Sequence, residues 1–269
     1  MVGAVTKTLV VASYLGTLAV NILANTLPIN NITTGAVSDS YPNLFAPAGI
    51  SFSIWGVIYL LLGLFVLYTL GVFKDVTRQK KVIDQVSEYF IISSVANMLW
   101  IFSWHYDQIL ASMFFMIVIL VCLVKIASAL GRRNLRGKEY IFLELPFSVY
   151  FGWITVATIA NVTVLLVSIG WGGFGLSDAF WTVAVIAIGT VIGIWRMAKD
   201  KSIAYGLVFI WAYLGILIKH TSAAGFGYAY PSVILAASIC ILAFLGCGIA
   251  FTVKKKSSFL RLMPGKKKA

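Results

Sequence analysis

Residues 50–73 read ISFSIWGVIYLLLGLFVLYTLGVF, a run without a single charged side chain. A helix crosses the hydrocarbon core of a bilayer with about 20 apolar residues, so this run is long enough to span a membrane. The rest of the chain follows the same pattern, since 60% of its 269 residues are hydrophobic and 11% are charged. Soluble domains carry about 25% charged residues. Open sheet edges are not tolerated in lipid, so the composition predicts an all-α integral membrane protein.

Eight membrane-spanning runs are expected along the chain. They cover residues 7–27, 50–73, 84–105, 108–130, 139–168, 177–197, 203–221 and 230–253. Lys and Arg cluster after the second, fourth, sixth and eighth runs, whereas the loops after the first, third and fifth runs contain none. The positive-inside rule then predicts that both termini are cytoplasmic. The net charge of +12 is attributed to these loops, which are expected to contact anionic lipid rather than nucleic acid.

The loop between the first two runs is the longest outer segment. Residues 26–49 read TLPINNITTGAVSDSYPNLFAPAG, with one acidic residue and no Lys or Arg. Tyr41 and Phe45 favour a lid that folds back over a cavity, because exposed aromatic side chains are costly in a free linker; a plain solvated linker is the alternative. Asn21 and Asn25, at the end of the first run, are expected to tether this lid through bonds from their amides to its backbone.

Three of the predicted helices carry sparse aromatic and polar residues at helical spacing. These residues are Trp55 and Tyr59; Asn97, Trp100 and Trp104; and Tyr150, Trp153 and Asn161. An unpaired amide at mid-span is costly in hydrocarbon, so Asn97 and Asn161 are expected to face protein, water or a ligand. The patterns therefore predict a shared interior surface. An interfacial aromatic belt for Trp55 and Tyr59, and a purely structural bond between helices for each Asn, are the alternatives.

Known catalytic patterns are missing from the sequence. It contains no Ser/His/Asp set, no H-E-x-x-H and no Gly-rich phosphate loop,. His105 and His220 are expected on the outer surface, and the three cysteines, at 122, 240 and 247, lie in apolar runs without metal-ligand spacing,. We therefore expect no enzymatic activity, no catalytic residue, no metal site and no required cofactor.

The aromatic and Asn patterns resemble the TspO/translocator-protein family, the tryptophan-rich sensory proteins. Pro47 and the stretch Ile54-Trp55-Gly56-Val57-Ile58-Tyr59 are similar to the signature of the family's second span. The third-span and fifth-span signatures are matched by Asn97, Trp100 and Trp104 and by Tyr150, Trp153, Ala157 and Asn161. Ala48 and Val149 stand where the family has proline. The resemblance covers about residues 5–170, and three further spans follow that the five-span family lacks.

The resemblance implies a TspO-like five-helix bundle over residues 1–170, with a pocket beneath the external lid of residues 26–49. Residues 171–253 would then form three additional transmembrane helices, and residues 254–269 a basic cytoplasmic tail. The implied ligand is a flat hydrophobic molecule, tetrapyrrole-like (a porphyrin or haem-like compound) or sterol-like. The resemblance and the chemistry of the residues together identify a set of ligand-binding candidates. They are Pro47, Trp55, Tyr59, Asn97, Trp100, Trp104, Tyr150, Trp153 and Asn161, with Tyr41 and Phe45 in the lid.

The leading hypothesis is a multi-pass receptor or carrier, in the cell membrane, for such a ligand. Two alternatives stay open: a permease-type transporter that uses all eight helices, and a structural subunit of a larger membrane complex. A homo-oligomer or a partner in a membrane complex is compatible with each of them.

Overall fold

The computed structural model describes residues 2–27, 29–73, 80–131, 133 and 135–261, and of residues 254–261 it describes the backbone only. Within these ranges it is helical and contains no strand. Eight helices are long and apolar enough to cross a membrane. They are α1 (Ala4–Thr26), α3 (Ile54–Leu70), α4 (Lys80–His105), α5 (Ile109–Leu130), α6 (Leu145–Ser168), α7 (Asp178–Asp200), α8 (Ile203–Thr221) and α9 (Pro231–Arg261). The predicted all-α class with eight spans is confirmed, and α9 continues past the expected end at residue 253.

The helix ends follow from local chemistry. The helix α3 ends at Gly71, whose φ of 86° lies in the left-handed region that glycine adopts without steric cost,. A π-helical turn, η4 (Tyr140–Glu144), precedes α6, whose first turn contains Pro146. Proline has no N–H to donate, so it is tolerated at this position. Ser202 caps α8 by accepting a hydrogen bond from the Tyr205 amide (3.4 Å),.

The first five long helices form a ring. Contacts run from α1 to α4, from α4 to α5, from α5 to α6, from α6 to α3 and from α3 back to α1. In the order of this ring α1 lies between α3 and α4, although Phe65 of α3 and Phe90 of α4 meet edge to face with ring centroids 5.3 Å apart. The segment between α1 and α3 lies over the outer end of this ring and contains the short helix α2 (Thr34–Asp39).

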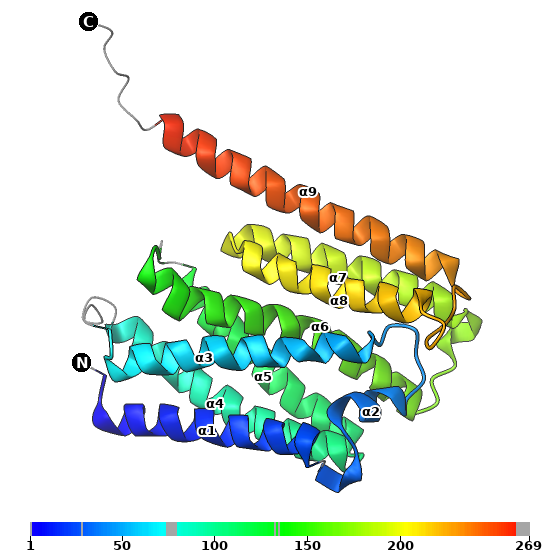
Figure 1. Ribbon diagram of the computed structural model, residues 1–269, viewed down its shortest axis with the longest axis horizontal. Helices are drawn as coiled ribbons and strands as arrows, with labels where there is room; N and C mark the ends of the chain where they lie inside the picture. The colour runs from blue at the N-terminus through cyan, green and yellow to red at the C-terminus, as the bar shows by residue number, and fades with distance from the viewer. Residues whose placement is uncertain (1, 28, 74–79, 132, 134, 262–269) are drawn as a thin grey trace, which may run out of the picture.

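The last three long helices form a second group beside the ring. Figure 1 shows α7, α8 and α9 stacked on the side of the ring where α6 lies. The helix α8 is the main link, since it packs against α6 and α9, and α7 packs against α9. Close approach between α6 and α8 depends on Gly152, where an added Cβ would lie 2.9 Å from the Tyr205 carbonyl oxygen and 2.9 Å from Val208 Cβ.

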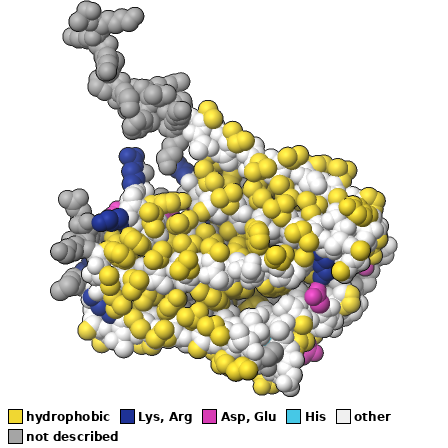
Figure 2. Space-filling model, viewed as in Figure 1, with side chains coloured by type: hydrophobic (Ala, Val, Ile, Leu, Met, Phe, Trp, Pro, Cys, Tyr) yellow, Lys and Arg dark blue, Asp and Glu magenta, His cyan; other side chains and the backbone are white. Residues whose placement is uncertain are grey.

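Lys and Arg side chains lie mainly at one end of the helices, as expected when that end faces the cytoplasm. Figure 2 shows apolar side chains over the flanks of the helices, with most of the Lys and Arg in this view at the end where α1 begins. In Figure 1, α9 ends on that same side. An even number of spans and positive charge at this end agree with cytoplasmic termini.

Candidate functional site: a cavity beneath the lid

The lid segment is packed against the outer end of α4. His105, at the end of that helix, is 2% exposed and lies beneath the lid. Its Nε2 is 3.0 Å from Thr34 Oγ1, and its carbonyl oxygen accepts a hydrogen bond from Asn30 Nδ2 (2.8 Å). Trp104 Nε1 donates to the Thr34 carbonyl oxygen (3.1 Å). The expectation that His105 lies on the outer surface was therefore wrong, because the lid covers it.

The second half of the lid is also packed. The Tyr41 hydroxyl donates a short hydrogen bond to Asp107. Burial, followed by this bond and the charge of the Asp107 carboxylate, raises the pKa of Tyr41 to about 12, so the phenol stays protonated as the donor. Phe45 is 1% exposed. Asn43 Oδ1 accepts from the amides of Phe45 (3.1 Å) and Ala46 (2.8 Å), which satisfies the backbone of the turn. These contacts hold the second half of the lid in place over the outer ends of the helices.

A cavity of about 260 Å³ lies under α2, between α1 and the start of α3. Its lining comprises Asn21, Asn25, Thr34, Phe52, Ser53 and Trp55. Among the nine ligand-binding candidates from the sequence, Trp55 is the one that lines it. Phe52 and Thr34 were not predicted, since a Phe or Thr near a helix end has no signal that distinguishes it from any other.

Asn21 and Asn25 lie in the wall of the cavity, and among the described residues their amide nitrogens donate to α1 and α4 rather than to the lid. Asn21 Nδ2 donates to Asn97 Oδ1 (2.8 Å) and to the Thr17 carbonyl oxygen (2.9 Å). Asn25 Nδ2 donates to the Asn21 carbonyl oxygen (2.9 Å). The expectation of bonds from these amides to the lid was wrong, because both side chains turn back along α1 or toward α4.

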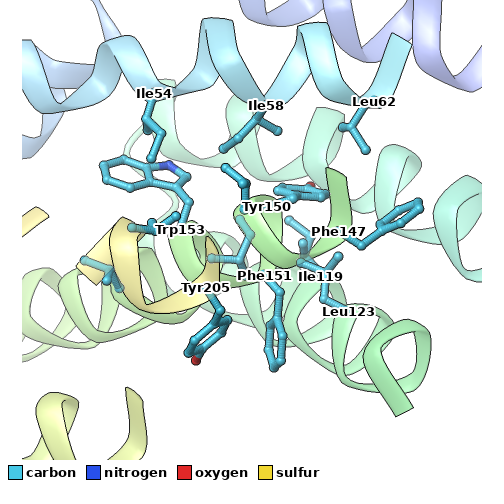
Figure 3. Close-up of a cluster of buried hydrophobic side chains, with 14 of the residues drawn as sticks. Ile54, Ile58, Leu62, Ile119, Leu123, Phe147, Tyr150, Phe151, Trp153 and Tyr205 are labelled. Atoms are coloured by element: carbon cyan, nitrogen blue, oxygen red, sulfur yellow. The ribbon is translucent and has the colours of Figure 1, made fainter. Parts of the chain in front are cut away.

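Five aromatic side chains from α3, α6 and the turn before α3 form what we call the aromatic cluster. Its members are Phe52, Trp55, Tyr59, Tyr150 and Trp153. Trp55 is at its centre: it stacks on Tyr59 with ring centroids 5.5 Å apart, and its centroid lies 5.9 Å from Tyr150 and 6.4 Å from Trp153. Figure 3 shows Trp153 beneath Ile54 in the seam between α3 and α6. The structure thus joins the second-span and fifth-span patterns into one aromatic wall.

Among the described residues, two polar atoms of the predicted site residues are buried without a hydrogen-bond partner, Tyr59 OH and Trp153 Nε1. Asn97 has partners, because its Oδ1 accepts from Asn21 Nδ2 and its side chain is hydrogen-bonded to Tyr150. Each of these residues contacts the lining, because Asn97 is bonded to Asn21, Tyr59 stacks on Trp55, and Trp153 meets Phe52 edge to face with centroids 6.0 Å apart. Unsatisfied buried polar groups are uncommon in native proteins, and Tyr59 and Trp153 lie behind the lining residues Trp55 and Phe52 rather than in the lining itself.

The remaining candidates do not line the cavity, although Trp104 is bonded to the lining residue Thr34. Trp100 Nε1 donates to Asn161 Oδ1 (2.9 Å), and Asn161 Nδ2 donates to Ser112 Oγ (3.1 Å). This network joins α4, α5 and α6, so the Asn161 amide is fully engaged in contacts between helices. Trp104 stacks on Trp100 with centroids 5.7 Å apart. Pro47 is buried against α8, where its Cβ faces Gly215.

Comparison with known proteins places the whole bundle in one family. The family model described as TSPO-like protein matches residues 7–250, a range that includes helices α7 and α8 and most of α9 as well as the five-helix ring. Searches of curated proteins and of solved structures gave no significant match. With eight apolar helices and a family match over most of its length, the chain belongs to the TSPO-like protein family and is an integral, multi-pass membrane protein.

Proposed function

We propose that this protein is a membrane receptor or carrier that binds a flat hydrophobic ligand beneath the lid, without catalysing a reaction on it. The observation that carries the proposal is the position of the cavity, which lies directly against the aromatic cluster. Aromatic walls suit a planar apolar molecule, because offset and edge contacts between rings add to the burial of apolar area. A small number of polar groups beside such walls orient the ligand.

The unpartnered polar atoms favour a ligand with hydrogen-bond acceptors at its edge. The indole nitrogen of Trp153 is a donor only, and the hydroxyl of Tyr59 can donate as well,. A tetrapyrrole carries carboxylates as acceptors at its edge, whereas a sterol offers a single hydroxyl. We therefore infer a tetrapyrrole-like ligand, with sterol-like molecules as weaker binders.

The size of the cavity suits partial burial of such a molecule. Small-molecule sites typically enclose about 300–1,000 Å³, and the cavity of about 260 Å³ is close to the lower limit. Asn25 and Ser53 are exposed at its rim. One edge of the ligand would enter beside Trp55, and the remainder would extend along the outer ends of α1 and α3.

Replacing Trp55 with leucine is expected to weaken protoporphyrin binding about tenfold. Leucine keeps an apolar side chain, but the flat wall of the cavity and the stacking on Tyr59 are lost, and a tenfold change corresponds to about 1.4 kcal/mol. Binding would be measured in nanodiscs from the shift of the porphyrin Soret absorption. The control is Trp195→Leu, since Trp195 is 57% exposed on α7. Equal affinities for the wild type and Trp55→Leu would rule out this site.

Replacing Trp153 with phenylalanine tests the role of the donors. The ring and most of the packing remain, and the unpartnered Nε1 is removed. A hydrogen bond contributes about 0.5–1.5 kcal/mol, so protoporphyrin affinity should fall about fivefold while the affinity for cholesterol changes little. Trp195→Phe is the matched control. A loss of equal size for both ligands would show that the indole N–H does not select for acceptors.

Transport is a separate property from binding. Flux of protoporphyrin into liposomes that depends on Trp55 would identify a carrier, and tight binding without flux would identify a receptor. Flux that is insensitive to Trp55→Leu would favour the permease, in which all eight helices form the path.

A further inference from the structure

The helix α8, from the second group of helices, binds the turn that leads into α3. The Ala48 amide donates to the Gly215 carbonyl oxygen (3.0 Å). Trp211 Nε1 donates to the Ser51 carbonyl oxygen (3.0 Å). Both bonds reach the backbone of the turn, so they hold the path of the chain itself and not only its side chains.

Two further contacts extend this attachment to the outer end of α8. His220 is fully buried, and its Nε2 lies 2.9 Å from the Leu44 carbonyl oxygen. Lys219 Nζ lies 2.6 Å from Asp39 Oδ1 in an ion pair whose Asp side chain is 59% exposed. Exposed ion pairs contribute little, so the buried contacts are the important part of the attachment. The expectation that His220 is a surface residue was wrong for the same reason as for His105.

The approach of α8 to the turn is close at Gly215. A Cβ at this position would lie 1.8 Å from Ser51 Oγ and 3.0 Å from Pro47 Cβ. A side chain at 215 would first require Ser51 Oγ to rotate away, and its Cβ would still press on the turn through Pro47 Cβ and Ser51 Cβ, at 3.0 and 3.1 Å. Pro47, one of the ligand-binding candidates from the sequence, packs against this glycine.

The attached turn carries half of the cavity's lining. Phe52, Ser53 and Trp55 lie at or just after Ser51, and the other lining residues come from α1 and α2. We propose that α8 is a positioning element for the ligand site: by fixing the turn before α3, it sets where Phe52 and Trp55 stand and how fast a ligand exchanges. The effect on ligand exchange rests on the proposed function, whereas the effect of α8 on the position of the turn can be tested without a ligand.

The first test measures the width of the cavity by electron spin resonance. Spin labels at Asn25→Cys and Ser53→Cys, two exposed residues across the cavity, are introduced after replacing Cys122, Cys240 and Cys247 with alanine. Gly215→Ala should shift or broaden the distance distribution between the labels. The matched control is Gly246→Ala, because a Cβ at residue 246 meets no heavy atom within 4 Å. An unchanged distribution in Gly215→Ala would overturn the inference.

A second label pair separates local displacement from general loosening. Leu99 on α4 and Phe114 on α5 are both exposed, and the distance between labels at these positions should stay the same in Gly215→Ala. Adding Ser51→Ala should restore much of the wild-type distribution across the cavity, because it removes the Oγ that the new Cβ would meet. That Oγ has no hydrogen-bond partner among the described residues, so its removal breaks no bond there. Failure of this rescue, or equal broadening in both label pairs, would contradict local positioning.

The third measurement connects position to ligand exchange. Protoporphyrin should dissociate about three to ten times faster from Gly215→Ala and from Trp211→Phe, which keeps a ring but loses the bond to Ser51. Trp195→Phe is the control for the second variant. A shifted label distance with an unchanged dissociation rate would refute the claim that α8 controls exchange. A shifted distance in a protein that binds no porphyrin at all would refute the proposed function and leave the positioning role of α8 intact.

Discussion

Replacing Gly152 with valine is expected to lower the free energy of unfolding by about 3 kcal/mol, at the upper end of the range for overpacked cores. The reason is the close contact between α6 and α8. The Cβ of a residue at 152 meets a backbone oxygen, that of Tyr205, at 2.9 Å, and the Cβ of Val208 at the same distance. A flexible side chain could move aside, but a helix backbone cannot move without shifting α8 as a whole.

The measurement is unfolding of the purified protein in mixed micelles by SDS, with tryptophan fluorescence as the signal. Gly246→Val on α9 is the matched control, since its side chain enters open space and should change stability little. If Gly152→Val were as stable as this control, the two groups of helices would not be joined at the α6–α8 contact. Because α8 also positions the turn before α3, the variant should further weaken ligand binding.

Replacing Asn161 with leucine is expected to destabilise the ring by about 1–3 kcal/mol. The Asn161 amide accepts from Trp100 Nε1 (2.9 Å) and donates to Ser112 Oγ (3.1 Å), and all three groups are buried. Leucine has a similar volume but no polar atom, so the indole N–H of Trp100 loses its acceptor. A buried donor without a partner costs about 1–3 kcal/mol.

A double variant identifies the cause of this loss. Trp100→Phe together with Asn161→Leu removes both partners, and replacing both partners is close to neutral in the favourable case. The double variant should therefore recover a large part of the stability lost in Asn161→Leu alone. Asn25→Leu is the control, because that amide is partly exposed and, among the described residues, bonds to a carbonyl on its own helix. An Asn161→Leu variant as stable as the wild type would show that the network does not contribute.

Residues that look alike in the sequence can have different roles in the structure, as Asn97 and Asn161 show. Asn97 and Asn161 look alike in the sequence, since each lies near mid-span and close to a Trp. In the structure Asn161 is bonded to Trp100 and Ser112, whereas Asn97 is bonded to Asn21 and Tyr150. Which partner reaches which amide depends on how α1, α4, α5 and α6 are rotated about their axes. That rotation arises from packing between helices and leaves no mark in a single span.

The sequence by itself determined the class, the number of spans and the family resemblance, and it predicts the orientation of the spans. These properties depend only on the order of residues along the chain. Bilayer thickness sets the length of each apolar run, and the placement of Lys and Arg sets the direction of each span. Only the tertiary structure decided that α3 and α6 bring Trp55 and Trp153 together, and that α8 reaches across to the turn before α3. Such contacts depend on close approach at positions such as Gly152 and Gly215, and an apolar helix surface looks the same in sequence whether it faces lipid or another helix.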